Sequence, residues 1–296
     1  MPLVGYHQSP IIGYHRAPLS QKFGAPRQPN LVALTSAIEM VAPYDTPAAF
    51  EGLDAFSHIW ISWQFHHNYQ YKNSGHSDNH QADSNFRAQV RPPRLGGNQK
   101  IGVFASRSMY RPSALGLSVV KLERVEVIQG RILLIIEGAD MIDGTPIIDI
   151  KPYVSYSDAL IQAQSGFAPA APTLLDVIMT EHAYEQFMLL VSTKEPAGIN
   201  DSDEGSTHIS NHISSHIKSA TRNATVAATL RQIQSQLVVS DIDAIKALVA
   251  QDPRPAYRRQ EVDASFVMRY KSVDVGFRLI ASGQLQITSV VAIALV

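Results

Sequence analysis

The sequence predicts a mainly β protein in which a small β-barrel domain, residues 1–162, is followed by a smaller α+β domain, residues 163–296. Two observations lead to this prediction. The first half contains many short β-branched and apolar segments separated by turn-forming residues, which is typical of barrels and sandwiches. The second half begins after a Gly-, Ala- and Pro-rich linker at 166–172, and it places apolar residues at helical spacing between further strand-like segments.

The strands expected in the first half are short and are separated by turns. Each combines Ile, Val, Leu or Trp with alternating polar residues, or consists almost entirely of Ile and Leu. The connections contain Gly, Asn, Asp and Pro, the residues that turns require. The expected strands are residues 31–40, 58–65, 101–105, 117–127 and 131–137.

The second half mixes helices with strands. Residues 174–179 are expected to form a strand, and Thr180 suits the N-cap of a helix over 181–191. Helical spacing relates Val226, Leu230, Ile233 and Leu237. A helix that begins at Asp241 should end at Asp252, because a residue before proline is driven out of the α conformation. Residues 265–296 return to strands.

Two polar segments interrupt this pattern, at about 68–88 and about 198–219, and we expect them to be surface insertions. Histidines repeat in them at intervals of four residues. No carboxylate accompanies them at zinc-enzyme spacing such as His-Glu-x-x-His, so we predict no metal site. A metal-dependent hydrolase remains an alternative that this spacing alone supports. The histidines are His76, His80, His208, His212 and His216.

Composition excludes several classes of protein. The chain is 45% hydrophobic and 17% charged without a long apolar run, so we expect no membrane span and no membrane partner. Its first residues do not combine a charged head with an apolar segment, and we therefore expect a cytoplasmic protein. Because cysteine is absent, disulfides and cysteine nucleophiles are excluded. No Gly-x-Gly-x-x-Gly, P-loop or Gly-x-Ser-x-Gly motif is present.

Basic residues are concentrated in two places although the net charge is only −1. Residues 87–111 contain six basic residues and no Asp or Glu. A second basic group surrounds Tyr257. Such patches can bind phosphates, although a solvated surface with ordinary ion pairs is an equally simple interpretation. The residues expected to contact nucleic acid are Arg91, Arg94, Arg111, Arg254, Tyr257 and Arg258.

Five turns carry Arg or Asp side chains, and four of them also contain proline or glycine. Proline fixes φ and glycine permits a close approach, so such turns can hold donors and acceptors in set positions. They could simply connect strands, but five of them within one small β domain favour a shared site. The turns are residues 26–29, 91–98, 105–108, 111–116 and 143–146.

These motifs, in this order over nearly the whole chain, resemble those of the TrmO (YaeB/TsaA-like) family of tRNA (adenine-N6)-methyltransferases. Further matching blocks are residues 12–13, 42–44, 52–60, 102–104, 149–153 and 251–258. The resemblance implies a non-Rossmann β-barrel that binds S-adenosyl-L-methionine as a homodimer, with a C-terminal domain for the tRNA anticodon loop. It implies methylation of N6-threonylcarbamoyladenosine at tRNA position 37, giving N6-methyl-N6-threonylcarbamoyladenosine. A non-catalytic RNA-binding module is the alternative.

The resemblance also implies the cofactor contacts. Arg107 is expected to fix a carboxylate by paired hydrogen bonds. His67 departs from the family pattern, in which Gln is common at this position. The proton acceptor is not assigned, and the catalytic candidates are His66, Asp143 and Arg107. The implied cofactor-binding residues are Pro26, Arg27, Gln28, His66, His67, Arg107, Leu117, Asp143, Gly144, Thr145 and Pro146.

Overall fold

The computed structural model describes residues 7–67, 87–193 and 225–293. The insertion expected at 198–219 lies outside these ranges, as does nearly all of that expected at 68–88. The five histidines considered as metal ligands, His76, His80, His208, His212 and His216, also lie outside the described residues.

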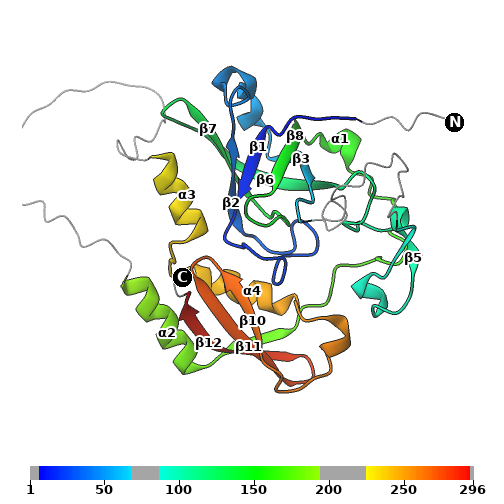
Figure 1. Ribbon diagram of the computed structural model, residues 1–296, viewed down its shortest axis with the longest axis vertical. Helices are drawn as coiled ribbons and strands as arrows, with labels where there is room; N and C mark the ends of the chain where they lie inside the picture. The colour runs from blue at the N-terminus through cyan, green and yellow to red at the C-terminus, as the bar shows by residue number, and fades with distance from the viewer. Residues whose placement is uncertain (1–6, 68–86, 194–224, 294–296) are drawn as a thin grey trace, which may run out of the picture.

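Six strands close into a barrel, which confirms the mainly β prediction for the first half (Figure 1). Their order around the barrel is β1-β2-β7-β6-β3-β8, and every neighbouring pair is antiparallel. Closure leaves no open sheet edge. The strands are β1 (Gly13–Arg16), β2 (Thr35–Met40), β3 (His58–Gln64), β6 (Leu115–Ile128), β7 (Arg131–Glu137) and β8 (Pro146–Pro152).

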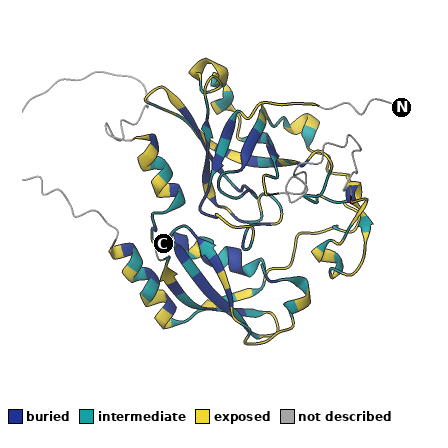
Figure 2. Cartoon of the chain, viewed as in Figure 1, coloured by how far each residue is buried: buried dark blue, intermediate teal, exposed yellow. Residues whose placement is uncertain are grey.

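The interior of the barrel is filled by alternate side chains of its strands. On β3 the buried residues are Ile59, Ile61 and Trp63, while the residues between them are more accessible. They pack against Ile38 of β2 and Leu134 of β7, both fully buried. Burial therefore follows the period of two along β3, whereas β7 is buried on both faces because α3 covers its outer side. Figure 2 shows the buried residues along the barrel strands.

The second half forms a four-stranded sheet with two helices, which confirms the α+β prediction. The sheet order is β10-β11-β12-β9, with β9 parallel to β12. Thr180 caps α2 as predicted, since its side chain accepts a hydrogen bond from the Ala183 amide at 3.1 Å. The elements are β9 (Asp176–Met179), α2 (Glu181–Ser192), α4 (Asp241–Ala250), β10 (Phe266–Tyr270), β11 (Val273–Ala281) and β12 (Gln284–Ala292).

Shorter elements connect these units. Strands β4 (Gln89–Val90) and β5 (Ile101–Gly102) pair as a small hairpin, and α1 (Ser155–Asp158) follows the barrel. The strand expected at 101–105 is wrong beyond residue 102, because residues 103–105 turn into a 3-10 helix. The strand expected to begin at residue 31 begins only at Thr35. The other 3-10 helices among the described residues are Pro47–Phe50, Leu53–Ala55, Pro93–Leu95 and Ala256–Arg258.

Each half of the chain contributes a segment that packs on the other half. Leu19, Val32 and Leu34, from the first half, belong to the apolar core of the C-terminal sheet. Phe23 stacks on the rings of Phe266 and Phe277, with centroids 6.4 and 6.3 Å away. In return, α3 (Val226–Gln234) packs on barrel strands rather than on the C-terminal sheet. The boundary predicted at residue 162 is thus crossed by packing from both sides.

No helix among the described residues is both long enough and apolar enough to cross a bilayer.

Candidate functional site

The turn at residues 143–146 is fixed by backbone hydrogen bonds to β1 and the residues after it. The amide of Gly144 donates to the carbonyl of His15 at 2.8 Å, and the amide of Asp143 donates to that of Leu19 at 2.8 Å. Gly144 has φ +75°, a left-handed conformation that glycine adopts without strain. The turn is therefore a rigid feature at one end of the barrel, as its composition predicts.

The carboxylate of Asp143 is held by two donors on the same oxygen. Oδ1 accepts from the backbone amide of Ala17 at 2.9 Å and from Nε2 of Gln234 at 2.7 Å. Gln234 is the last residue of α3, so a side chain from the second half of the chain reaches the barrel. The two bonds fix the orientation of this carboxylate.

His15 lies buried under the same turn. Its Nδ1 is 3.2 Å from the carbonyl oxygen of Ile142, and its Nε2 is buried without a hydrogen-bond partner among the described residues. Burial lowers the pKa of His15 to about 4; the Ile142 carbonyl and Asp143 oppose the shift, and Arg16 adds to it. The imidazole is therefore neutral at pH 7, which suits a residue that supports the turn from inside.

His66 and His67 follow β3 and are both exposed, with ring centroids 4.1 Å apart. Partial desolvation lowers the pKa of His66, and His67 lowers it further, whereas the Gln64 backbone and the charge of Asp143 raise it. The effect of the Asp143 charge on this pKa indicates that His66 lies near the turn at 143–146. A neutral, accessible imidazole beside that turn can accept a proton at pH 7.

Arg107 connects two other motif turns. Its Nη1 donates to Oε1 of Gln28 at 2.5 Å, so the turns at 26–29 and 105–108 meet. The positive charge of Arg107 also acts on Asp140, whose pKa is raised chiefly by burial and lowered in smaller measure by Ser118 and Arg107. The exposed guanidinium therefore lies at the same end of the barrel as the turn that follows Asp140.

Asp140 is a residue that sequence reasoning missed. Its Oδ1 accepts from Oγ of Ser118 at 2.6 Å, and that Oγ accepts from Nε1 of Trp63 at 3.0 Å. The Trp63 ring presses on Gly116, where an added Cβ would lie 2.2 Å from the ring. Leu117, between Gly116 and Ser118, is 54% exposed despite being apolar. The only feature of the sequence that pointed to Asp140 was its position three residues before the turn at 143–146.

The side chain of Arg27 is directed toward the C-terminal half. Its Nη2 lies 3.5 Å from the carbonyl oxygen of Asp252, and its pKa is lowered by desolvation and by Arg259, against the effect of Asp252. The preceding Pro26 is buried. The expected cofactor contact of Arg27 stays a prediction. In the structure, its side chain contacts Asp252 of the C-terminal half.

The two basic groups expected from the sequence lie together. Gly97 of the turn at 91–98 approaches Ala256, since an added Cβ there would lie 3.9 Å from the Ala256 Cβ. The 3-10 helix Ala256–Arg258 thus places Tyr257, 83% exposed, and Arg258 beside the turn that carries the exposed Arg91 and Arg94. Arg94 is additionally oriented by a 2.6 Å hydrogen bond to the carbonyl of Ala170.

The surface position expected for Arg254 is wrong. Its side chain is only 1% exposed and donates to both carboxylate oxygens of Asp252, at 2.7 and 3.2 Å. A buried charge needs such a partner, so the residue before Pro253 determines where this arginine lies. Arg111 is half-buried, and its Nη1 donates to the carbonyl of Ser106 at 2.6 Å, which fixes the turn at 105–108.

The donors and acceptors at this end of the barrel suit a zwitterionic molecule that carries a nucleoside. Arg107 offers an exposed guanidinium for a carboxylate, and Asp143 offers a carboxylate for an ammonium group. The exposed Leu117 offers an apolar surface for a base. Within the described ranges, no three His, Asp or Glu side chains gather as a metal site.

Comparisons with known proteins agree with the sequence motifs. The tRNA-methyltransferase O N-terminal domain family matches residues 14–159, and the TrmO C-terminal domain family matches residues 219–293. The tRNA (adenine(37)-N6)-methyltransferase of Escherichia coli is 31% identical over 88% of this chain and 91% of its own length.

Two proteins of Pseudomonas aeruginosa extend the comparison. RcsF, whose name proposes an S-adenosylmethionine-dependent methyltransferase, is 46% identical over 56% of this chain, a match that spans 62% of that protein. The crystal structure of TrmO aligns with 98% of this chain and all of its own, with a TM-score of 0.64 and 27% identity.

Proposed function

The chain belongs to the TrmO family, and from this premise we propose that it uses S-adenosylmethionine to methylate N6 of N6-threonylcarbamoyladenosine at tRNA position 37. That it is a tRNA (adenine(37)-N6)-methyltransferase follows from its full-length relative. The finer proposal adds the donor and the threonylcarbamoyl group of the substrate. The observation that carries the choice of donor is the 2.5 Å contact between Arg107 and Gln28, which brings two motif turns together.

The proposed donor site uses residues from four segments. Arg107 would hold the carboxylate of the donor, the turn at 143–146 would hold its ammonium group, and Leu117 would cover the adenine. Pro26 to Gln28 and the histidine pair His66-His67 would complete the contacts. When bound, S-adenosylmethionine supplies a methyl group activated by a sulfonium centre.

The main task of the protein in this reaction is alignment. The exocyclic nitrogen of adenine is a weak nucleophile because its lone pair is delocalised into the ring. Holding nitrogen, methyl carbon and sulfur in line can contribute up to about 7–11 kcal/mol to catalysis. The turn at 143–146 suits this task, because backbone hydrogen bonds fix its position before any ligand binds.

Among the three catalytic candidates, we assign the proton acceptor to His66. It is exposed, and desolvation lowers its pKa, so the neutral ring is available at pH 7. Arg107 remains protonated and cannot accept a proton. Asp143 already accepts two hydrogen bonds on Oδ1, which suits binding and orientation better than proton transfer.

The tRNA surface in this proposal is formed by Arg91, Arg94, Tyr257 and Arg258. Arginines at this surface can contact phosphates, and the exposed Tyr257 ring can stack on a base. A base in the anticodon loop is single-stranded, so it can enter a pocket without the cost of breaking a duplex. Arg254 is left out of this surface because it is buried, and Arg111 serves to orient the turn at 105–108.

Mass spectrometry of tRNA nucleosides tests the proposed substrate. Unmodified and threonylcarbamoylated tRNA would each be incubated with the protein and S-adenosylmethionine labelled in its methyl group. We expect the labelled methyl group only on N6-threonylcarbamoyladenosine. Label on unmodified adenine at position 37 would contradict the finer substrate, and absence of label from both tRNAs would contradict the proposed reaction.

A non-catalytic RNA-binding module would present the same basic surface without a donor site. Calorimetric titration of the purified protein with S-adenosylmethionine separates the two functions, because only the enzyme should take up the donor.

The resemblance also motivates the proposal of a cytoplasmic homodimer. Sedimentation of the purified chain should then give about twice the mass of the 32.5 kDa protomer. A sedimenting species of one protomer at micromolar concentration would contradict the dimer.

A further inference from the structure

Gln234 occupies a position that connects the two halves of the molecule. It ends α3, whose Val226 and Ile233 are buried against Ala37, Leu133 and Ile135 of the barrel. From there its Nε2 donates to Oδ1 of Asp143 at 2.7 Å. A neutral amide donor beside a carboxylate contributes a directed hydrogen bond without neutralising the charge, so Asp143 remains available for a cationic group.

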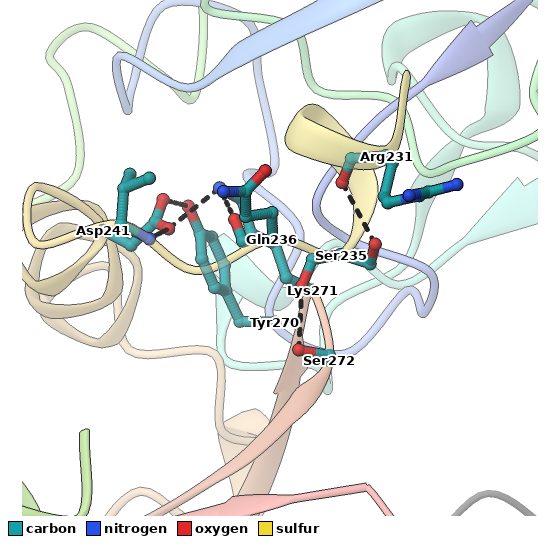
Figure 3. Close-up of polar contacts among 8 residues, drawn as sticks. Arg231, Ser235, Gln236, Asp241, Tyr270, Lys271 and Ser272 are labelled. Carbon is teal, nitrogen blue, oxygen red and sulfur yellow. Dashed lines mark hydrogen bonds and ion pairs between the residues drawn. The ribbon is translucent and has the colours of Figure 1, made fainter. Parts of the chain in front are cut away.

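The chain just after Gln234 is fastened to the C-terminal sheet (Figure 3). Nζ of Lys271 donates to the carbonyl of Gln236 at 2.9 Å, and Oγ of Ser272 donates to that of Ser235 at 2.8 Å. Lys271 and Ser272 form the turn between β10 and β11. The end of α3 therefore cannot move independently of this turn.

A buried ion pair stabilises the fastening. Nζ of Lys271 lies 2.8 Å from Oδ2 of Asp241, and both side chains are only 8% exposed. Oδ1 of Asp241 accepts from the hydroxyl of Tyr270 at 2.6 Å, and Oδ2 also accepts from the Val238 amide at 2.8 Å. A buried charge pair with its hydrogen-bonding capacity filled in this way fixes one geometry.

The same turn also supports the second donor to Asp143. The backbone amide of Lys271 donates to the carbonyl of Pro18 at 2.6 Å. Pro18 follows Ala17, whose amide is the other donor to Oδ1 of Asp143 at 2.9 Å. Gln234 and Ala17 are the two donors to this oxygen. Each lies within two residues of a carbonyl that accepts a hydrogen bond from the turn at Lys271.

We propose that Gln234 is a positioning residue for the donor site, and that the turn at Lys271 makes the geometry of Asp143 depend on the C-terminal half. The inference rests on the proposed function, since it takes Asp143 as a contact of S-adenosylmethionine. It assigns to α3 a role in donor binding, which is distinct from contact with the tRNA.

The test uses the full chain and a matched pair of variants. Gln234→Met keeps the length of the side chain and removes the donor, while Gln232→Met makes the same change at an exposed position of α3. Binding of S-adenosylhomocysteine is measured by calorimetry. Hydrogen exchange of the Ala17 and Asp143 amides is measured in the ligand-free protein, and melting temperature checks the fold.

We expect Gln234→Met to weaken binding about tenfold and to speed exchange at both amides, because one charge-assisted hydrogen bond is lost. Gln232→Met should behave as the unchanged protein does. In methyl transfer, KM for the donor should rise more than kcat falls.

A third variant, Gln234→Glu, places a second carboxylate against Asp143. Its affinity should be lowest at pH 8 and recover as the pH is lowered toward 5, where a protonated Glu can again donate, whereas Gln234→Met should show no such recovery. Unchanged binding and exchange in Gln234→Met, with the unchanged protein binding normally, would overturn the inference alone. Failure of the unchanged protein to bind S-adenosylhomocysteine would overturn the proposed donor site together with it.

Discussion

Arg107 is the residue whose removal should damage the proposed reaction most while leaving the fold intact. Its guanidinium is exposed and contacts a side chain, Gln28, rather than the core. Loss of hydrogen bonds from a charged group costs about 1.5–3 kcal/mol, so Arg107→Ala should weaken donor binding roughly 10- to 100-fold. Methyl transfer should fall to background with an unchanged circular dichroism spectrum. The exposed Arg124, paired with Glu126, provides a control in Arg124→Ala. Full activity of Arg107→Ala would remove this residue from the site.

His15 should make the stability of the fold depend on pH. Its pKa is lowered by burial from 6.5 to about 4, with the Ile142 carbonyl and Asp143 opposing this shift and Arg16 adding to it. Between these two values the unfolded chain binds the proton and the folded chain does not, so stability decreases as the pH is lowered from about 6.5 to about 4. The loss from this residue is about 3 kcal/mol.

Denaturant unfolding of the unchanged protein and of His15→Gln, from pH 4 to pH 8, measures this effect. Glutamine can still donate toward the Ile142 carbonyl but does not titrate in this range. We expect the pH dependence of unfolding to be shallower in His15→Gln by about 3 kcal/mol. Parallel curves for the two proteins would show that His15 titrates normally in the folded chain.

Single residues also show where sequence reasoning stops. The motif turns identified Arg107, Gln28 and the segment 143–146 because Gly, Pro, Arg and Asp are recognisable in a turn. Asp140 and Gln234 carry no such signal, since each acquires its role from a partner far away in the sequence. The burial of Arg254 could not be predicted either: its partner Asp252 is close in the sequence, but its burial depends on how the 252–259 segment packs.

At the scale of elements, long strands with alternating or continuous apolar residues were predictable and short ones were not. Strands β3, β6 and β7 have seven or more residues and follow the expected pattern closely. Strand β1 has only four residues, and it joins the barrel through its pairing with β2 and β8. The helical spacing correctly predicted α3, but Leu237 lies beyond its end at Gln234, where the fastening to Lys271 begins.

The packing of β3 against β6 gives a prediction about Gly116. An added Cβ would lie 2.2 Å from the Trp63 ring, so Gly116→Ala must displace the ring or the strand. Overpacking of this kind costs about 1–3 kcal/mol. Urea unfolding should show a lower midpoint, with a weaker Trp63–Ser118 hydrogen bond as the local cause. Gly102→Ala is the control, because open space surrounds that position and its φ of −59° suits alanine. Equal midpoints for both variants would contradict the close packing.

The turn at 91–98 gives a prediction about tRNA binding. Arg91 is exposed there, beside the 3-10 helix that carries Tyr257. If Arg91 contacts a phosphate, Arg91→Ala should reduce the slope of log affinity against log salt by roughly 0.7–0.9. Filter binding of tRNA from 50 to about 200 mM salt measures the slope. Arg278→Ala is the control, because this arginine of β11 is already paired with Asp263. An unchanged slope for Arg91→Ala would place the phosphate contacts elsewhere.

At the scale of the whole molecule, each half of the chain contributes a segment that packs on the other half. The segment with Leu19, Phe23, Val32 and Leu34 completes the C-terminal core, and α3 completes the outside of the barrel. The motif turn at 26–29 lies within the exchanged segment. The proposed donor site would therefore be built across the two halves, with its contact residues in the first half and Gln234 in the second.

This packing predicts that the full chain unfolds cooperatively and that the isolated first half does not form a stable, ligand-binding monomer. Residues 1–162 alone would expose the apolar side chains that the C-terminal sheet covers and would lack Gln234. We expect one calorimetric transition for the full chain, with equal calorimetric and van't Hoff enthalpies. The fragment should bind a hydrophobic dye, associate, and show no binding of S-adenosylhomocysteine.

Solubility and binding can be separated in the fragment by replacing the uncovered apolar residues. The variant Leu19→Ser, Phe23→Ser, Val32→Ser should restore a monomer without restoring binding, because the support for Asp143 from Lys271 and Gln234 is still missing. A monomeric fragment that binds S-adenosylhomocysteine as the full chain does would show that the barrel is self-sufficient. Two separate transitions in the full chain would show that the exchanged segments contribute little to cooperativity.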